Sequence, residues 1–146
     1  MQPLEKDRPA IPPRDKARLY FFLGLLASAI LYSAYNLYIL DPYVYAAMGR
    51  STRHIYKFGS IIIAWLIGFL IFRKIAPAWL LQLWNIIYIA GLGLLLLLAG
   101  YDSLIYPLPQ TLRQPISTFH EALISPIPYV VLALLTIAIH RSSRHE

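Results

Sequence analysis

A run of 27 residues between Lys74 and Asp102 carries no charged side chain. Its central part reads LLQLWNIIYIAGLGLLLLLAG. An α-helix needs about 20 mostly apolar residues to cross the hydrocarbon core of a bilayer. A chain of 146 residues has no interior in which a soluble fold would bury so long an apolar helix. The run therefore predicts a transmembrane helix over about 78–100.

The composition extends this prediction to the whole chain. Hydrophobic residues make up 58% of the sequence and charged residues only 14%, whereas soluble domains carry about 25% charged residues. We expect an all-α polytopic integral membrane protein that forms one compact bundle, with no separate soluble domain.

The charge-free stretches predict four transmembrane helices, at about 19–40, 55–75, 78–100 and 126–140. The second contains the shortest charge-free stretch, because only 15 residues separate Lys57 from Arg73. Its cationic side chains are long enough to reach the head groups from inside the bilayer boundary. The domain organisation expected is a Pro-rich cytoplasmic arm (1–18), a membrane bundle (19–140) and a basic cytoplasmic tail (141–146).

Two shorter helices are expected outside the spans. Asp41 suits an N-cap and Pro42 the first helical position, so a short helix is expected directly after the first span. In the longest loop, residues 101–125, three prolines predict an irregular first half. The second half, ISTFHEALI, predicts a short amphipathic helix on the outer membrane surface.

The distribution of basic residues predicts the orientation. Four spans would place nine of the thirteen Lys and Arg residues on the side of the two termini and four on the other side. This asymmetry favours cytoplasmic termini, with a bacterial inner membrane as the expected location. The net charge of +6 is then explained by this bias and by contact with anionic lipids, and not by nucleic acid. Tyrosines are expected at the outer boundary, at Tyr38, Tyr43, Tyr45, Tyr56, Tyr101, Tyr106 and Tyr129.

Small and polar residues within the spans predict helix packing. Small side chains four residues apart let helices approach closely, and amides inside a membrane seek partners on other helices. A ligand or proton path is the other interpretation of the amides, and we favour packing. The expected packing residues are Ser60, Ala64, Gly68, Gly24, Ser28, Asn36, Gln82 and Asn85.

One collection of polar residues at the outer side resembles a binding site. It is a candidate site for an anion or a lipid head group, formed by Arg50, Arg53, His54, Arg113, His120 and Glu121. A metal on His54, His120 and Glu121 is geometrically possible, but we expect neither metal nor cofactor. The chain has no cysteine, which excludes thiolate chemistry and disulfides. No nucleophile, base and orienting group stand out, so we favour a role other than catalysis.

These features favour an accessory or scaffold subunit of a larger membrane complex, with other membrane subunits and anionic lipids as partners. Two alternatives stay open. One is a small transporter or channel. The other is a membrane enzyme, or a lipid- or quinone-binding protein, that uses the outer cluster.

Overall fold

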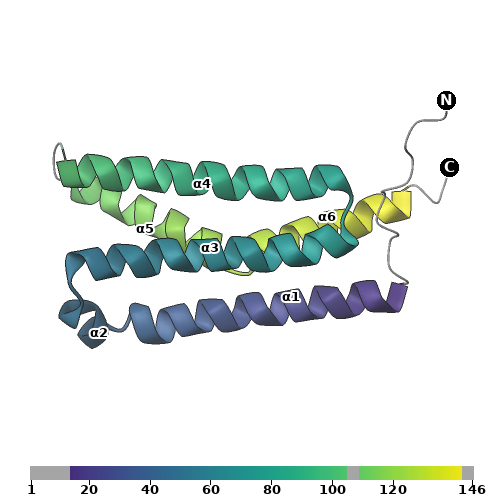
Figure 1. The fold of residues 1–146 in the computed structure, drawn as a ribbon, viewed down its shortest axis with the longest axis horizontal. Helices are drawn as coiled ribbons and strands as arrows, with labels where there is room; N and C mark the ends of the chain where they lie inside the picture. The colour runs from purple at the N-terminus through teal and green to yellow at the C-terminus, as the bar shows by residue number, and fades with distance from the viewer. Residues whose placement is uncertain (1–13, 105–108, 143–146) are drawn as a thin grey trace, which may run out of the picture.

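The computed structural model describes residues 14–104 and 109–142, and all its regular elements in these ranges are helices (Figure 1). The predicted all-α class is therefore confirmed for this part of the chain. Residues 1–13 of the expected arm and 143–146 of the expected tail lie outside it. The elements are α1 (Arg14–Ala34), a π-helix η1 (Tyr35–Ile39), α2 (Pro42–Ala47), α3 (Arg50–Ile75), α4 (Ala78–Leu104), α5 (Gln110–Ile124) and α6 (Ile127–Ser142).

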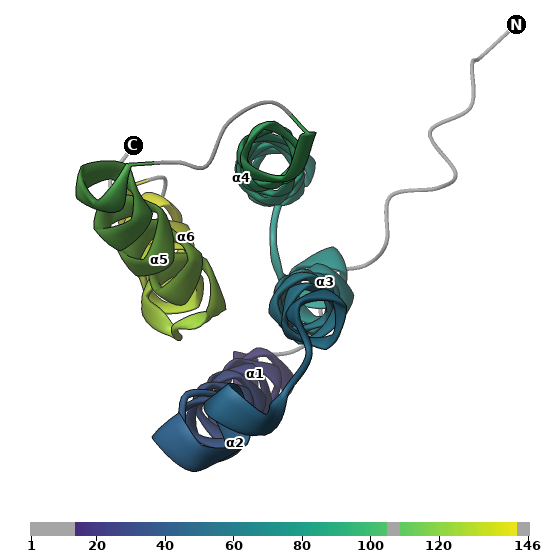
Figure 2. The same ribbon diagram turned by 90° about the vertical axis from the view of Figure 1, so that its left-hand side faces the viewer.

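Three of the described helices are long and apolar enough to cross a membrane: Lys16–Ile39, Ser51–Ile75 and Ala78–Asp102. A fourth candidate combines Gln110–Ile124 with Ile127–Thr136, two helices that bend by 49° at a short break. The structure therefore offers three spans, or four if the bent pair is one span, which is consistent with a helical membrane protein. Viewed along the bundle, α1, α3, α4 and the α5–α6 pair surround a common core (Figure 2).

The position of α5 differs from the expectation of a short helix on the outer membrane surface. The helix begins at Gln110, runs along the bundle and contacts α1, α3 and α4 (Figure 1). Its apolar side packs into the core through Leu123 and Ile124, with Ile116 beside them. An amphipathic pattern suits a bundle as well as a membrane surface, so α5 is a wall of the bundle and not a helix lying across its end.

Pro115 also departs from the expected irregular chain, because it lies inside α5. A proline within a helix removes the hydrogen bond to the carbonyl four residues before it, here that of Thr111. Thr111 is exposed, so its carbonyl lies in a part of the helix that polar surroundings can solvate. Thr118 also lies within the helix, and its hydroxyl donates to the carbonyl of Gln114 at 3.1 Å.

The break between α5 and α6 occurs at Ser125-Pro126. Pro126 has no N–H and cannot continue the hydrogen bonding of α5. The Ser125 hydroxyl donates to the carbonyl of Ala122 at 2.8 Å, and the Tyr88 hydroxyl of α4 donates to the carbonyl of Leu123 at 2.7 Å. An unsatisfied backbone group inside a bilayer costs several kcal/mol, so these side chains make the break tolerable.

The expected short helix after the first span is confirmed. The Asp41 carboxylate accepts hydrogen bonds from the backbone of Tyr43 at 2.9 Å and of Val44 at 3.3 Å, and Pro42 takes the first helical position. The chain then turns through Gly49, which is extended and precedes α3 directly. The turn before α2 and the turn after it together reverse the chain, so the start of α3 lies beside the end of the first span.

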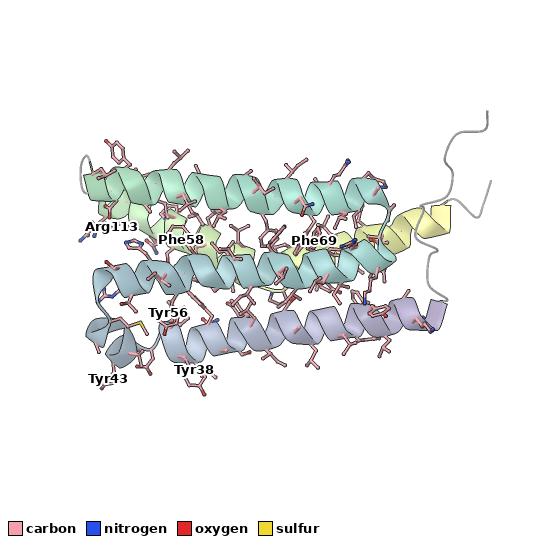
Figure 3. All side chains as sticks on the ribbon, viewed as in Figure 1. Tyr38, Tyr43, Tyr56, Phe58, Phe69 and Arg113 are labelled. Atoms are coloured by element: carbon pink, nitrogen blue, oxygen red, sulfur yellow. The ribbon has the colours of Figure 1, made fainter. Side chains whose placement is uncertain are left out.

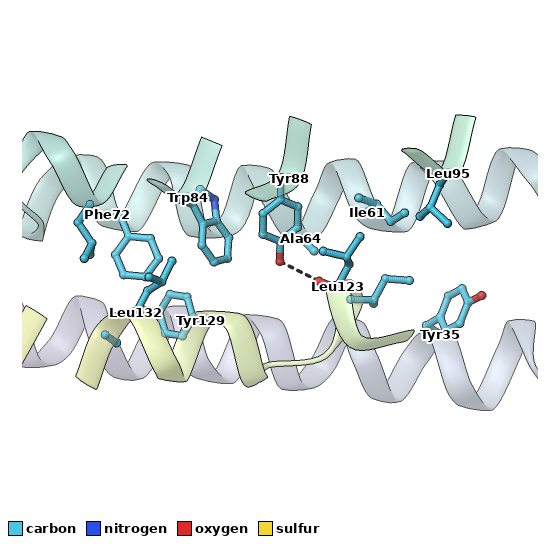
Figure 4. Packing of buried hydrophobic residues seen from close by; sticks show 13 residues of the cluster. Tyr35, Ile61, Ala64, Phe72, Trp84, Tyr88, Leu95, Leu123, Tyr129 and Leu132 are labelled. Atoms are coloured by element: carbon cyan, nitrogen blue, oxygen red, sulfur yellow. Dashed lines mark hydrogen bonds between the residues drawn. The ribbon is translucent and has the colours of Figure 1, made fainter. Parts of the chain in front are cut away.

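Aromatic rings fill the core of the bundle (Figure 4). Trp84 of α4 is 1% exposed, and its ring centroid lies 4.4 Å from that of Tyr88 and 5.1 Å from that of Phe72. Tyr129 of α6 stacks on Phe72 at 5.1 Å. Tyr129 is therefore a core residue and not part of the outer tyrosine belt. Tyr38, Tyr43, Tyr56 and Tyr101 are exposed, as a boundary position requires.

The small residues expected to mediate packing are all buried: Gly24, Ser28, Ser60, Ala64 and Gly68. The two glycines receive aromatic rings from neighbouring helices. A Cβ added at Gly68 would collide with the indole of Trp84, and one added at Gly24 would collide with the phenol ring of Tyr129. The small side chains thus make room for large ones as well as for close backbone approach.

The three amides of the spans have different surroundings. Asn85 of α4 accepts a hydrogen bond from the Trp65 indole of α3 at 2.9 Å, as expected for a packing residue. Asn36 instead donates to the carbonyl of Tyr32 on its own helix at 2.8 Å. Gln82 is exposed on α4.

We expect Gly68→Ala to destabilise the protein, because the new methyl group collides with a ring that is itself fully packed. Overpacking of this kind costs about 1–3 kcal/mol. The measurement is the free energy of unfolding in mixed micelles titrated with sodium dodecyl sulfate. Gly93→Ala is the matched control, because nothing lies within 4 Å of a Cβ added there. Equal stability of the two variants would contradict this account of the core.

Candidate functional site

A cavity of about 920 Å³ opens where α3 and α5 begin and α4 ends. Its walls come from these three helices, and its size is in the range of about 300–1,000 Å³ that is typical of ligand sites. Figure 3 shows Arg113 of α5 and Phe58 of α3 in this part of the bundle. The site therefore lies at a bundle end where several polar side chains meet an apolar interior.

The cavity brings together four of the six predicted site residues: Arg53, His54, Arg113 and His120. Glu121 does not line it, and its carboxylate accepts a hydrogen bond from the Ser117 hydroxyl at 3.3 Å. Arg50 begins α3, and its side chain lies outside the described part of the structure.

The charges around the cavity are mainly positive. Arg53, Lys57 and Arg113 line it together with one acid, Asp102, which leaves a net charge of +2 from these four residues when the histidines are neutral. Arg113 pairs with Asp102 at 3.6 Å, and the side chain of Arg113 is 56% exposed. The side chain of Asp102 is 18% exposed. The Arg113 guanidinium is therefore open to water on one side, where an incoming anion can compete for it.

Arg53 has a structural contact in addition to its place on the wall. Its Nε donates to the carbonyl of Met48 at 3.0 Å, which holds the turn between α2 and α3. This hydrogen bond holds the guanidinium group in place beside the cavity.

His120 forms the buried floor of the cavity. It is 5% exposed, and its Nε2 lies 3.0 Å from the carbonyl of Lys57 on α3. A carbonyl only accepts, so Nε2 carries the proton and donates. In the neutral ring Nδ1 then accepts, and the Tyr35 hydroxyl lies 3.5 Å from it. His120 therefore links α5 to α3 and to the π-helical end of α1.

Polar residues that the sequence argument missed complete the α5 wall. Gln110, Gln114 and Ser117 line the cavity on the same side of the helix as Arg113 and His120. The sequence feature that indicates this wall is a set of polar residues that recur at helical spacing from 110 to 120. The prolines predict an irregular chain before Ile116, so Gln110, Arg113 and Gln114 are not expected on one helix with Ser117 and His120.

Apolar side chains form the remaining wall. Phe58 of α3, Leu95 and Leu98 of α4 and Ile116 of α5 all face the cavity. The His54 ring stacks on Phe58 with centroids 6.3 Å apart. The cavity therefore offers cations and hydrogen-bonding groups in combination with a hydrophobic surface.

This arrangement is suited to binding. Among the described residues, no group of three or more histidine or acidic side chains is placed to hold a metal ion. The Ser117 hydroxyl directs its proton to Glu121, and the His120 ring has both nitrogens within reach of protein partners. The residues that face the cavity are those that hold an anion through charge-assisted hydrogen bonds.

Comparison of the chain with known protein families, curated proteins and solved structures finds no match.

Proposed function

We propose that this chain is an integral membrane protein whose end cavity binds the anionic head group of an amphiphile. The observation that carries the proposal is the meeting of Arg53, Lys57 and Arg113 with an apolar wall in one cavity of about 920 Å³. A soluble anion would need only the cations. An amphiphile also contacts the apolar surface, so an amphiphile is favoured over a free ion as the ligand.

The electrostatics of the cavity support an anionic ligand. Three cations and one carboxylate line the cavity together with apolar side chains of α3 and α4. Charges that interact next to a low-dielectric surface are screened less than charges in open water. A phosphate placed between Arg53 and Arg113 would therefore gain more than it would at an ordinary exposed arginine.

Removing the charge of Arg113 is expected to weaken the binding of anionic lipid. For Arg113→Gln we expect an increase in Kd for phosphatidylglycerol of about tenfold, because one charge-assisted hydrogen bond is lost. The measurement is native mass spectrometry of the protein in mild detergent, titrated with phosphatidylglycerol or phosphatidylcholine. Arg73→Gln is the control, because it removes the same charge near the far end of α3. The proposal fails if the two variants bind equally well, or if the native protein does not distinguish the two lipids.

We further propose a bacterial inner membrane with both termini cytoplasmic, so that the cavity faces the opposite side. The distribution of nine and four cations supports this orientation.

The orientation is tested by cysteine labelling. The chain has no cysteine, so in a single-cysteine variant only the introduced thiol can react with the label. Ser51→Cys at the start of α3 is expected to react with a membrane-impermeant maleimide in intact cells. Ala78→Cys at the start of α4 is expected to react only after lysis, and the reverse pattern would overturn the orientation.

A role as an accessory subunit of a membrane complex is the second candidate function, and Gln82 supports it. Its side chain is exposed on α4, within the 27-residue run that carries no charge. An amide that faces lipid lacks hydrogen-bond partners, whereas a neighbouring subunit can supply them. The aromatic core occupies the middle of the bundle, which gives the transporter alternative no support.

The subunit proposal is tested by purification in mild detergent followed by mass spectrometry. We expect a stoichiometric partner with the native chain and its loss with Gln82→Leu, because the interhelical hydrogen bond disappears. Ser33→Ala, at an exposed polar position on α1, is the control that should retain the partner. A native chain that purifies alone as a monodisperse monomer would overturn the proposal.

A further inference from the structure

The α5 wall of the cavity carries neutral hydrogen-bonding groups on both sides of its cation. Gln110 precedes Arg113 in the helix, and Gln114 and Ser117 follow it. From Gln110 to Ser117 the helix rises by about 10 Å. A ligand that contacts Arg113 therefore lies beside side chains that bind something other than negative charge.

The chemistry of these groups identifies what they recognise. A phosphate oxygen only accepts hydrogen bonds, so it uses the N–H groups of a glutamine and leaves the amide oxygen without a partner. A hydroxyl donates and accepts, and it matches both ends of an amide. The Ser117 hydroxyl donates to Glu121, so its oxygen is oriented to accept from a ligand. Asp102 adds a carboxylate acceptor to the same cavity.

We propose that the ligand is a phosphodiester of a polyol, with its phosphate at Arg113 and its hydroxyl groups at Gln110, Gln114 and Ser117. This inference rests on the proposed function and specifies the class of head group. A phosphodiester of glycerol or of a sugar could come from a lipid or from a free solute. The apolar wall of Phe58, Leu95 and Leu98 favours the lipid.

The test compares two lipids of equal charge and identical acyl chains. Phosphatidylglycerol carries two hydroxyl groups on its head group, and phosphatidylmethanol carries none, so hydrogen bonding to hydroxyls is the difference between them. In native mass spectrometry in mild detergent we expect the native protein to bind phosphatidylglycerol about fivefold more tightly, the effect of one or two hydrogen bonds. The double variant Gln110→Leu/Gln114→Leu is expected to bind the two lipids equally, with its affinity for phosphatidylmethanol unchanged.

Controls separate this inference from the proposed function. Thr111→Val changes an exposed polar residue of α5 that does not line the cavity, and it should keep the preference. If the native protein binds the two lipids equally while Arg113→Gln weakens both, the polyol inference is overturned and the anion site stands. If neither lipid binds better than phosphatidylcholine, the proposed function itself fails. Free glycerophosphoglycerol, the phosphodiester without acyl chains, should not displace the lipid at equal concentration, and displacement would overturn the assignment to a lipid.

Discussion

The bundle depends on hydrogen bonds that aromatic and imidazole side chains form with the backbone of neighbouring helices. Tyr129 donates to the carbonyl of Phe21 at 3.1 Å, and Trp84 donates to that of Trp65 at 3.0 Å. His120 contacts the carbonyl of Lys57 at 3.0 Å. In each case a small residue follows the accepting residue by three positions: Gly24, Gly68 and Ser60. The side chain at that position lies beside the carbonyl on the helix surface. Gly24 and Gly68 therefore leave the second lone pair of that carbonyl open to a neighbouring helix, whereas the Ser60 hydroxyl donates to the Lys57 carbonyl beside His120.

The same requirement explains how a broken helix is tolerated in the bundle. Between α5 and α6 the carbonyl of Leu123 has lost its place in a continuous helix, and Tyr88 supplies the missing donor. Gly91, one turn further along α4, lets Leu123 approach closely, since an added Cβ would lie 2.9 Å from its side chain. The break in turn allows α5 to follow a different direction from α6. Helix α5 therefore presents polar residues to the cavity, while α6 packs against the aromatic core.

The sequence predicted the parts of the fold that local chemistry determines. The charge-free run forms α4, because a long apolar segment in hydrocarbon becomes helical without tertiary contacts. Asp41 and Pro42 begin a short helix, because an N-cap also acts locally. The path of α5 could not be predicted, since an amphipathic helix buries its apolar side equally well in a bundle or on a membrane surface. Lys57 and Asp102 were missed as cavity residues because they were interpreted as the ends of spans. Lys57 and Asp102 become cavity residues only because α5 packs beside them.

Lys57 shows how packing and the proposed binding site depend on one another. Its side chain lines the cavity, while its carbonyl receives both His120 from α5 and the Ser60 hydroxyl from its own helix. The bond to His120 fixes the distance between α3 and α5 at the floor of the cavity. Above this point α5 is joined to α4 by the ion pair of Arg113 and Asp102, which is longer, at 3.6 Å, and whose arginine is 56% exposed. The cavity is therefore held firmly at its buried end and loosely at its mouth, where an anionic head group would enter and take the place of Asp102 at Arg113.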